Sequence, residues 1–294
     1  MDKNRLKNIL IGVFFAMLWA SAAPATKFGL MSADPFIIAD VRFFIAGGLM
    51  LFYVHFIRKE PLPPKHIWGK LTLFAALNTT IYLGAFVVAI REVSSGIGSL
   101  ATAVGPLFVI ILSAVWLKRK LKWYELVGVA LGLFGAGLAI WPLLQSSYAS
   151  PRGLLILAGG VVSISIASVY YTKIDWGLPR LVFNGWQVFI GGVLLLPATI
   201  YYSNFETAQW NLTFWLSVGW LVVPVSIVSL QLWFYLLKED AVKASMWLFL
   251  CPIFGFSYAS IIFNEPITWH TFLGTFFVIL GLYIAQFEKF KRKI

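Results

Sequence analysis

Polar side chains at helical spacing stand out within long apolar runs of this sequence. Asn78 and Tyr82 lie four residues apart, as do Gln231 and Tyr235, so each pair shares one face of a helix. An amide both donates and accepts hydrogen bonds, and a tyrosine adds a ring that can stack on an apolar group. An amide that faced lipid would be costly. We therefore interpret both pairs as candidate binding residues for a small amphipathic molecule.

Four further residues complete this candidate binding set. Trp19, Tyr170 and Trp247 lie in apolar runs at depths where their rings could stack on a ligand or bind a cation. Thr102 precedes Pro106 by one turn, where a proline leaves a carbonyl group without its helical hydrogen bond. For each single ring, contact with lipid or packing in the core is the alternative interpretation.

Three charged residues lie inside or at the ends of the first two apolar runs. Lys27, Asp40 and Arg42 could form a cationic gate, or a clamp for a carboxylate of the ligand. The alternative is a lysine whose side chain reaches the surface, combined with an ion pair between Arg42 and either Asp34 or Asp40.

The sequence shows no catalytic or metal-binding constellation. Cys251 is the single cysteine, and His55, His66 and His270 lack the spacing of metal ligands. No Walker A pattern is present. We expect no enzymatic activity, no metal and no bound cofactor.

Composition indicates which elements must position these residues. Of the 294 residues, 60% are hydrophobic and only 12% are charged, about half the charged fraction of an ordinary soluble domain. A helix needs about 20 apolar residues to cross a bilayer. The apolar runs predict an all-α integral membrane protein with ten transmembrane helices. We place them at 8–27, 36–57, 68–90, 95–117, 124–142, 153–173, 181–202, 214–237, 244–263 and 269–287.

The basic residues predict the orientation of these helices. Nineteen lysines and arginines flank one side of the predicted membrane, three flank the other, and Arg42 lies inside the second span. Because cytoplasmic loops carry the excess of positive charge, both termini are expected in the cytoplasm of a bacterium. Short flanking clusters argue against a nucleic-acid groove despite the net charge of +11. A signal peptide cleaved near Ala20-Ser21-Ala22 is the alternative for the first span, but the apolar pattern continues to Leu30.

Two prolines predict where the helices are irregular. Pro106 and Pro252 each fall near the middle of a predicted span, where proline removes a hydrogen bond and bends the helix. Irregular backbone at that depth is tolerated where protein shields it or where it lines an aqueous cavity. We predict a site at the midplane between the fourth and ninth spans. Helix bending without a functional role is the alternative.

The chain repeats itself at an offset of 146 residues. This shift places Pro106 on Pro252, Gly128 on Gly274 and Gly135 on Gly281. Since five spans per half is an odd number, the second half must enter the membrane from the opposite side. We expect two five-helix repeats, 1–146 and 147–294, related by inverted topology, an arrangement that supports alternating access to a central site.

Short motifs resemble the EamA branch of the drug/metabolite transporter superfamily. Leu18-Trp19-Ala20-Ser21 with Lys27, and Arg42-Phe43-Phe44-Ile45-Ala46, resemble the openings of its first two spans. Asn264-Glu265 resembles its Gly-Glu after the ninth span, and Gln187 a recurrent glutamine of the seventh. The chain departs from the pattern at Arg119, which replaces the glutamate of the first half.

The resemblance implies a ten-helix metabolite carrier, often an exporter, without an ATPase domain or a cofactor. We therefore expect a secondary transporter of small organic metabolites, for example amino acids or related amphipathic compounds, in the cytoplasmic membrane. The expected partners are a small-molecule substrate and the lipid bilayer. A channel or a non-transporting membrane scaffold is the alternative, and the oligomeric state is open.

Overall fold

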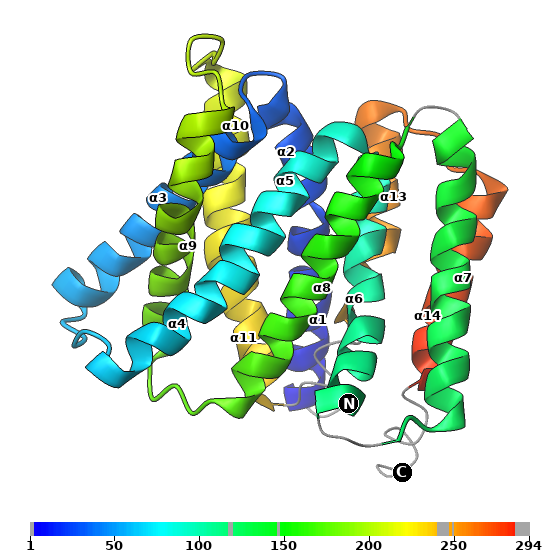
Figure 1. Cartoon of the computed structure of the whole chain (residues 1–294), viewed down its shortest axis with the longest axis horizontal. Coiled ribbons are helices and arrows are strands. Elements are labelled where there is room, and N and C mark those ends of the chain that lie inside the picture. Colours follow the sequence, from blue (N-terminus) through cyan, green and yellow to red (C-terminus); the bar gives the residue numbers. More distant parts are fainter. Residues whose placement is uncertain (1–2, 117–119, 146–147, 240–246, 249, 286–294) are drawn as a thin grey trace.

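The computed structural model describes residues 3–116, 120–145, 148–239, 247–248 and 250–285. Within them the chain is helical, with an isolated β-bridge between Val93 and Ala149 and no strand. Arg119, singled out by its departure from the family pattern, lies outside the described residues. Figure 1 shows a bundle in which most helices run between two opposite faces.

The first half contains five spans, several of which are built from more than one helical segment. Its elements are α1 (Lys3–Ala20), α2 (Ala22–Leu30), α3 (Pro35–Phe52), the π-helix η1 (Tyr53–Ile57), the 3-10 turn η2 (Lys65–Ile67), α4 (Trp68–Ala75), the π-helix η3 (Ala76–Leu83), α5 (Gly84–Glu92), α6 (Ser95–Trp116) and α7 (Trp123–Gln145).

The second half repeats this order of long and interrupted helices. Its described elements are α8 (Pro151–Lys173), α9 (Arg180–Tyr202), α10 (Leu212–Trp220), the π-helix η4 (Leu221–Ser229), α11 (Leu230–Glu239), α13 (Leu250–Phe263) and α14 (Trp269–Ala285). Pro151 starts α8 at a position where its missing N–H costs nothing, and Ser150 Oγ caps this helix by accepting from the Gly153 N–H at 2.9 Å.

These elements confirm the all-α fold with ten transmembrane helices. Eight stretches of the described chain are long and apolar enough to cross a membrane, and two shorter apolar helices, Leu250–Phe263 and Trp269–Gly281, stand at the ninth and tenth predicted spans. The third span is longer than predicted: it runs from Lys65 to Glu92. The first span continues past the break at Ser21, because Ser21 and Ala25 keep their backbone hydrogen bonds to the preceding turn.

Reciprocal packing of α7 against α14 shows the inverted repeat most directly. A Cβ atom built on Gly135 would lie 2.6 Å from the carbonyl oxygen of Gly274, and one built on Gly281 would lie 2.5 Å from that of Gly128. The 146-residue offset exchanges these two contacts, since it maps Gly128 to Gly274 and Gly135 to Gly281. The two helices run antiparallel (Figure 1). A two-fold relation between the halves follows from both observations.

The helices α3 and α9 meet in the same reciprocal way. Gly47 packs against Phe189, and Gly192 packs against Phe43, which is the 146-residue equivalent of Phe189. Small residues let helices approach closely in a membrane, where van der Waals packing replaces the hydrophobic effect as the main attraction. The second and seventh spans thus form a further contact between the two halves.

Two π-helical segments occupy equivalent places in the third and eighth spans. A shift of 146 residues moves η3, 76–83, onto 222–229, which is η4 apart from its first residue. A π-helix accommodates an extra residue per turn and often occurs at functional sites. In η4 the interruption contains Pro224. The most evident symmetric irregularity therefore lies in the third and eighth spans.

Candidate functional site

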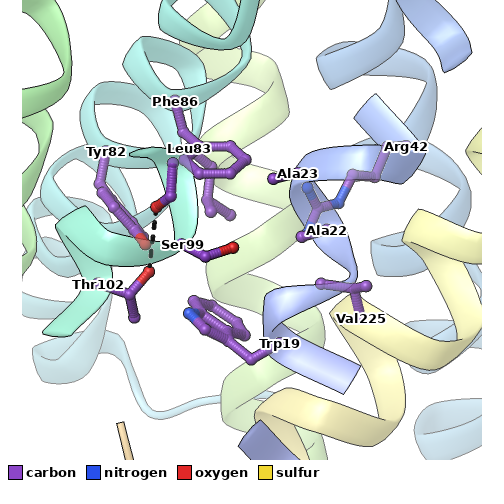
Figure 2. A pocket seen from close by; sticks show the side chains of 11 residues that line it. Trp19, Ala22, Ala23, Arg42, Tyr82, Leu83, Phe86, Ser99, Thr102 and Val225 are labelled. Carbon is purple, nitrogen blue, oxygen red and sulfur yellow. Dashed lines mark hydrogen bonds between the residues drawn. The ribbon is translucent and has the colours of Figure 1, made fainter. Parts of the chain in front are cut away.

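A small cavity lies between the π-helical segments η3 and η4 (Figure 2). The empty space among its side chains amounts to about 310 Å³, counting any part that opens to the surface, but it is narrow, and its widest part has room for little more than one water molecule. Aromatic and hydroxyl-bearing side chains line one end of the cavity, and small residues lie between this end and Arg42. The lining residues are Trp19, Ala22, Ala23, Arg42, Tyr82, Leu83, Phe86, Gly98, Ser99, Thr102 and Val225.

Four residues singled out from the sequence meet in this cavity. Trp19 comes from the end of α1, Arg42 from α3, Tyr82 from η3 and Thr102 from α6. Figure 2 shows the Tyr82 hydroxyl close to the Thr102 hydroxyl. The Trp19 ring lies below them in this view. Four separate spans therefore contribute to one site.

Arg42 is the charged residue of the cavity, and it is 1% exposed. Its Nε donates to Ser226 Oγ at 2.8 Å, whereas Nη1 and Nη2 are buried and have no hydrogen-bond partner among the described residues. No carboxylate of the described residues lies within 4.0 Å of the guanidinium. A charge at the centre of a membrane costs about 2.5–3.5 kcal/mol on insertion scales. The structure compensates this charge only in part.

A chain of hydrogen bonds holds Ser226, the partner of Arg42, in place. Gln187 Oε1 accepts from Asn78 Nδ2 at 3.1 Å and from Thr79 Oγ1 at 2.5 Å, and Gln187 Nε2 donates to Asn184 Oδ1 at 3.0 Å. Asn184 Nδ2 then donates to the backbone oxygen of Ser226 at 3.0 Å. This network joins η3, α9 and η4 and so links the two halves.

Asn78 therefore has a different position from the one its pairing with Tyr82 indicated. Tyr82 lines the cavity, whereas the Asn78 amide is committed to Gln187 on α9. Both side chains are buried. The π-helical segment η3 has more than four residues per turn, so the i, i+4 rule for a shared face no longer holds there.

Asp40 and Asp34 have partners other than Arg42. The buried Asp40 Oδ2 accepts a hydrogen bond from Thr199 Oγ1 on α9, and Asp40 Oδ1 is buried with no partner within the described chain. Asp34 pairs with Arg91 at 3.4 Å, in an exposed position. Neither carboxylate therefore neutralises Arg42 in this structure.

Lys27 forms a partly buried ion pair near the end of α2, a helix that lies at the face of the bundle opposite the start of α1 (Figure 1). Its Nζ lies 2.7 Å from Glu265 Oε1, which also accepts from the Ser95 N–H at 3.1 Å. Glu265 Oε2 accepts from the Gly96 N–H at 3.5 Å. A carboxylate at a helix N-terminus is favoured by the helix dipole and by the free N–H groups there. Glu265 thus joins the end of α2 to the start of α6.

Gln231 and Tyr235 lie against Arg180, away from the residues that line the cavity. Gln231 Nε2 donates to the Arg180 backbone oxygen at 3.5 Å, and the Arg180 guanidinium lies 5.2 Å from the centre of the Tyr235 ring. Both side chains belong to α11, which follows η4.

The remaining two aromatic candidates pack within the protein. Tyr170 lies 6.2 Å from Trp176, with which it makes an edge contact in a cluster of rings. Trp247 lies beside Gly12 of α1, so closely that any larger residue at Gly12 would meet its indole ring. Neither belongs to the lining of the cavity.

Pro106 and Pro252 differ in their helical context. Pro106 is buried inside α6, whereas Pro252 is the third residue of the described helix α13. The fourth and ninth spans do meet, since Gly255 packs against Ser99. The cavity lies to one side of this contact, toward the first, second, third and eighth spans.

Sequence reasoning missed Ser226 and Asn184, which position Arg42. Asn184 and Gln187 are three residues apart within an apolar span, so their polarity and spacing were a signal of a shared buried face. Serine carries no comparable signal, because a hydroxyl in a membrane helix often bonds to its own backbone.

A family model matches both halves of the chain, and similar proteins are named as transporters. The model of the EamA-like transporter family matches residues 6–141 and, a second time, residues 151–287. The uncharacterized transporter YvbV of Bacillus subtilis is 25% identical over 284 residues, which cover 96% of this chain and 92% of that protein. The uncharacterized inner membrane transporter YedA of Escherichia coli is 29% identical over 235 residues, or 78% of this chain and 74% of that protein.

A solved crystal structure shares the fold. It superposes with a TM-score of 0.70 and 17% sequence identity, and the match covers 98% of this chain and 99% of the other.

Proposed function

The chain belongs to the EamA-like transporter family and is a multi-pass membrane transporter, and from this premise we propose that it is a secondary carrier that exports small organic metabolites by alternating access. Amino acids and related amphipathic compounds are the proposed substrates. The proposed location is the cytoplasmic membrane of a bacterium, which the name of the inner membrane relative YedA supports. Export follows the expectation drawn from the family resemblance.

One observation carries this proposal: a narrow cavity with polar and aromatic side chains in its lining, to which both halves contribute. Its walls come from both repeats, since Tyr82 belongs to η3 and Val225 to η4. A site between inverted repeats can face each side of the membrane in turn when one half rocks against the other. The narrowness of the cavity is what an occluded state between the two open states would show.

The ion pair of Lys27 with Glu265 serves as a closure on one face in this proposal. If the excess of basic residues marks the cytoplasmic side, this pair lies on the outer side. At the equivalent place of the other half, Lys173 lies 4.7 Å from the ring of Trp116. The position equivalent to Glu265 is Arg119 in the sequence. The two closures would then differ in strength, the outer one being an ion pair.

Flux in proteoliposomes tests the proposed function. Vesicles that contain the purified protein are loaded with a labelled amphipathic metabolite, and its exit is measured with and without the unlabelled compound outside. A carrier gives saturable exit that an external substrate accelerates, because the loaded return step replaces the empty one. Exit that stays proportional to concentration and is never accelerated from the other side indicates a channel and contradicts the proposal.

A further inference from the structure

We propose that Arg42 binds the carboxylate of the transported molecule, so that the substrate is a small organic anion with an apolar or aromatic body. This inference rests on the proposed function, whose substrate class it narrows. It starts from the partial compensation of the Arg42 charge inside the cavity.

The guanidinium presents one complete edge to a ligand. Ser226 accepts from Nε, and this leaves Nη1 and Nη2, which are both buried and have no partner in the part of the chain that the structure describes. Two parallel N–H groups on the edge of a planar guanidinium match the two oxygens of a carboxylate. Figure 2 shows the Arg42 side chain extending from α3 toward the small residues Ala22 and Ala23 at the cavity wall.

The orientation of Arg42 is set before a ligand arrives. Ser226 lies on η4, and Asn184 holds the backbone of this residue through its own amide. Asn184 is in turn fixed by Gln187. Because a preorganised group loses little freedom on binding, more of its interaction energy appears as affinity.

The rest of the lining suits the body of such an anion. Trp19, Tyr82 and Phe86 provide rings, and Ser99 and Thr102 provide hydroxyl groups. The described lining residues include no aspartate or glutamate. A cationic substrate would meet the Arg42 charge without a carboxylate to offset it. An anion with an aromatic or branched apolar body finds both a cation and apolar surface.

A set of isosteric probes separates charge from shape. We propose measuring the thermal unfolding of the purified full chain, and its flux in proteoliposomes, with 3-phenylpropionate, 3-phenylpropionamide and 3-phenylpropylamine. L-phenylalanine and its amide form a second set, which distinguishes amino acids from simple organic acids. The carboxylates are expected to raise Tm and to compete for transport, and the amides and the amine are expected to do neither. Equal effects of the acid and its amide overturn the inference.

Variants then assign the effect to Arg42. Arg42→Met is expected to weaken the action of the carboxylate about tenfold or more, which is the range for a charged hydrogen-bonded pair. Its Tm without ligand should be equal or higher, since an unpaired buried charge is removed. Arg42→Lys keeps the charge without the planar edge, so its response to the carboxylate should lie between those of the parent chain and of Arg42→Met. Arg91→Gln is the matched control, because that arginine is exposed and pairs with Asp34.

The two readouts distinguish the inference from the function on which it rests. If carboxylates shift Tm in the parent chain but no compound is transported, the proposed function fails and the anion site stands. If compounds are transported regardless of charge, or if Arg42→Met and Arg42→Lys respond to the carboxylate as the parent does, the carrier stands and the Arg42 site is overturned. No response of Tm to any carboxylate also overturns it.

Discussion

Gln187 is the residue on which the contact between the halves converges. Its side chain accepts from Asn78 and Thr79 and donates to Asn184, and it is 0% exposed. Hydrogen bonds between membrane helices contribute about 0.6 kcal/mol each on average, because the unfolded chain in the membrane also finds partners. A buried group left without any partner costs more, about 1–3 kcal/mol. The loss of Gln187 would leave three such groups.

We predict that Gln187→Leu lowers the free energy of unfolding by about 3 kcal/mol or more, since packing is kept while three buried groups each lose a partner at a cost of about 1–3 kcal/mol. Thermal unfolding in detergent measures the change. Gln145→Leu is the control: this glutamine is exposed at the end of α7, and the change there should stay within about 0.5 kcal/mol. Equal stability of the two variants would show that the network does not hold the halves together.

The Lys27–Glu265 pair gives a second prediction for single residues. Glu265→Gln removes the charge that faces Lys27 and should favour opening of the proposed outer side by roughly fivefold, the effect of about 1 kcal/mol. A thiol placed in the cavity by Thr102→Cys, in a Cys251→Ala background, reports this opening through its rate of reaction with a membrane-impermeant reagent added outside.

The control for this closure is Asp34→Asn. It breaks the pair with Arg91, which is exposed, and exposed ion pairs contribute little. A reaction rate that rises as much in Asp34→Asn as in Glu265→Gln, or in neither, contradicts a gating role for Glu265.

At the scale of single residues, the sequence predicted part of the candidate site. Trp19, Tyr82, Thr102 and Arg42 are polar or aromatic groups within apolar runs, and the structure brings them together. The partners of Arg42 were out of reach, because Ser226 lies 184 residues away. Only the tertiary arrangement shows that Asp34 and Asp40 bond elsewhere, so that no carboxylate of the described residues pairs with the guanidinium.

The packing of α7 against α14 depends on the close approach of their backbones rather than on hydrogen bonds or charges of their side chains. Gly135 meets the backbone of Gly274, and Gly281 meets that of Gly128. With no hydrophobic drive between helices in lipid, this contact is stable because the two backbones lie in van der Waals contact. A single methyl group at such a place must separate them.

We predict that Gly135→Ala lowers Tm by several degrees, since its Cβ would lie 2.6 Å from the Gly274 carbonyl oxygen and overpacking costs about 1–3 kcal/mol. Gly137→Ala is the matched control on the same helix, where an added Cβ meets nothing within 4 Å. Alanine is the better helix former, so this variant should be equal or more stable. A comparable loss in both variants would mean that helix geometry, rather than the contact with α14, sets the effect.

For the helices, the sequence predicted which segments cross the membrane but not where they are irregular. Prolines indicated the fourth and ninth spans, whereas the two equivalent π-helical segments, η3 and η4, occur in the third and eighth. Of these, η4 contains Pro224, but the equivalent residue of η3 is Asn78. A π-helix is stabilised by its surroundings and has no residue preference strong enough to read. For this reason the sequence predicted a site between the fourth and ninth spans, whereas the cavity also involves the third and eighth.

For the whole molecule, the repeat and the orientation rest on different physical grounds. The repeat is visible as reciprocal contacts at one offset, since the contact of Gly135 with Gly274 mirrors that of Gly281 with Gly128. These contacts explain why the 146-residue offset in the sequence predicted the inverted fold correctly. The orientation of the protein in the membrane depends instead on the distribution of charge. The positions of the helices relative to each other do not show which face of the bundle is cytoplasmic. It therefore stays a prediction from the 19 and 3 basic residues.

Labelling of single cysteines tests the orientation. The natural Cys251 is buried and is the single cysteine of the chain, so Cys251→Ala gives a background without thiols. Gln209 lies in the exposed loop before α10, and Lys65 is the exposed first residue of η2, just before α4; these segments lie at opposite faces of the bundle (Figure 1). We expect a membrane-impermeant maleimide to label the Gln209→Cys variant in intact cells and the Lys65→Cys variant only after permeabilisation. The reverse pattern would place the Lys27–Glu265 pair on the cytoplasmic side, and labelling of both from outside would contradict the odd number of spans, five, between the two positions.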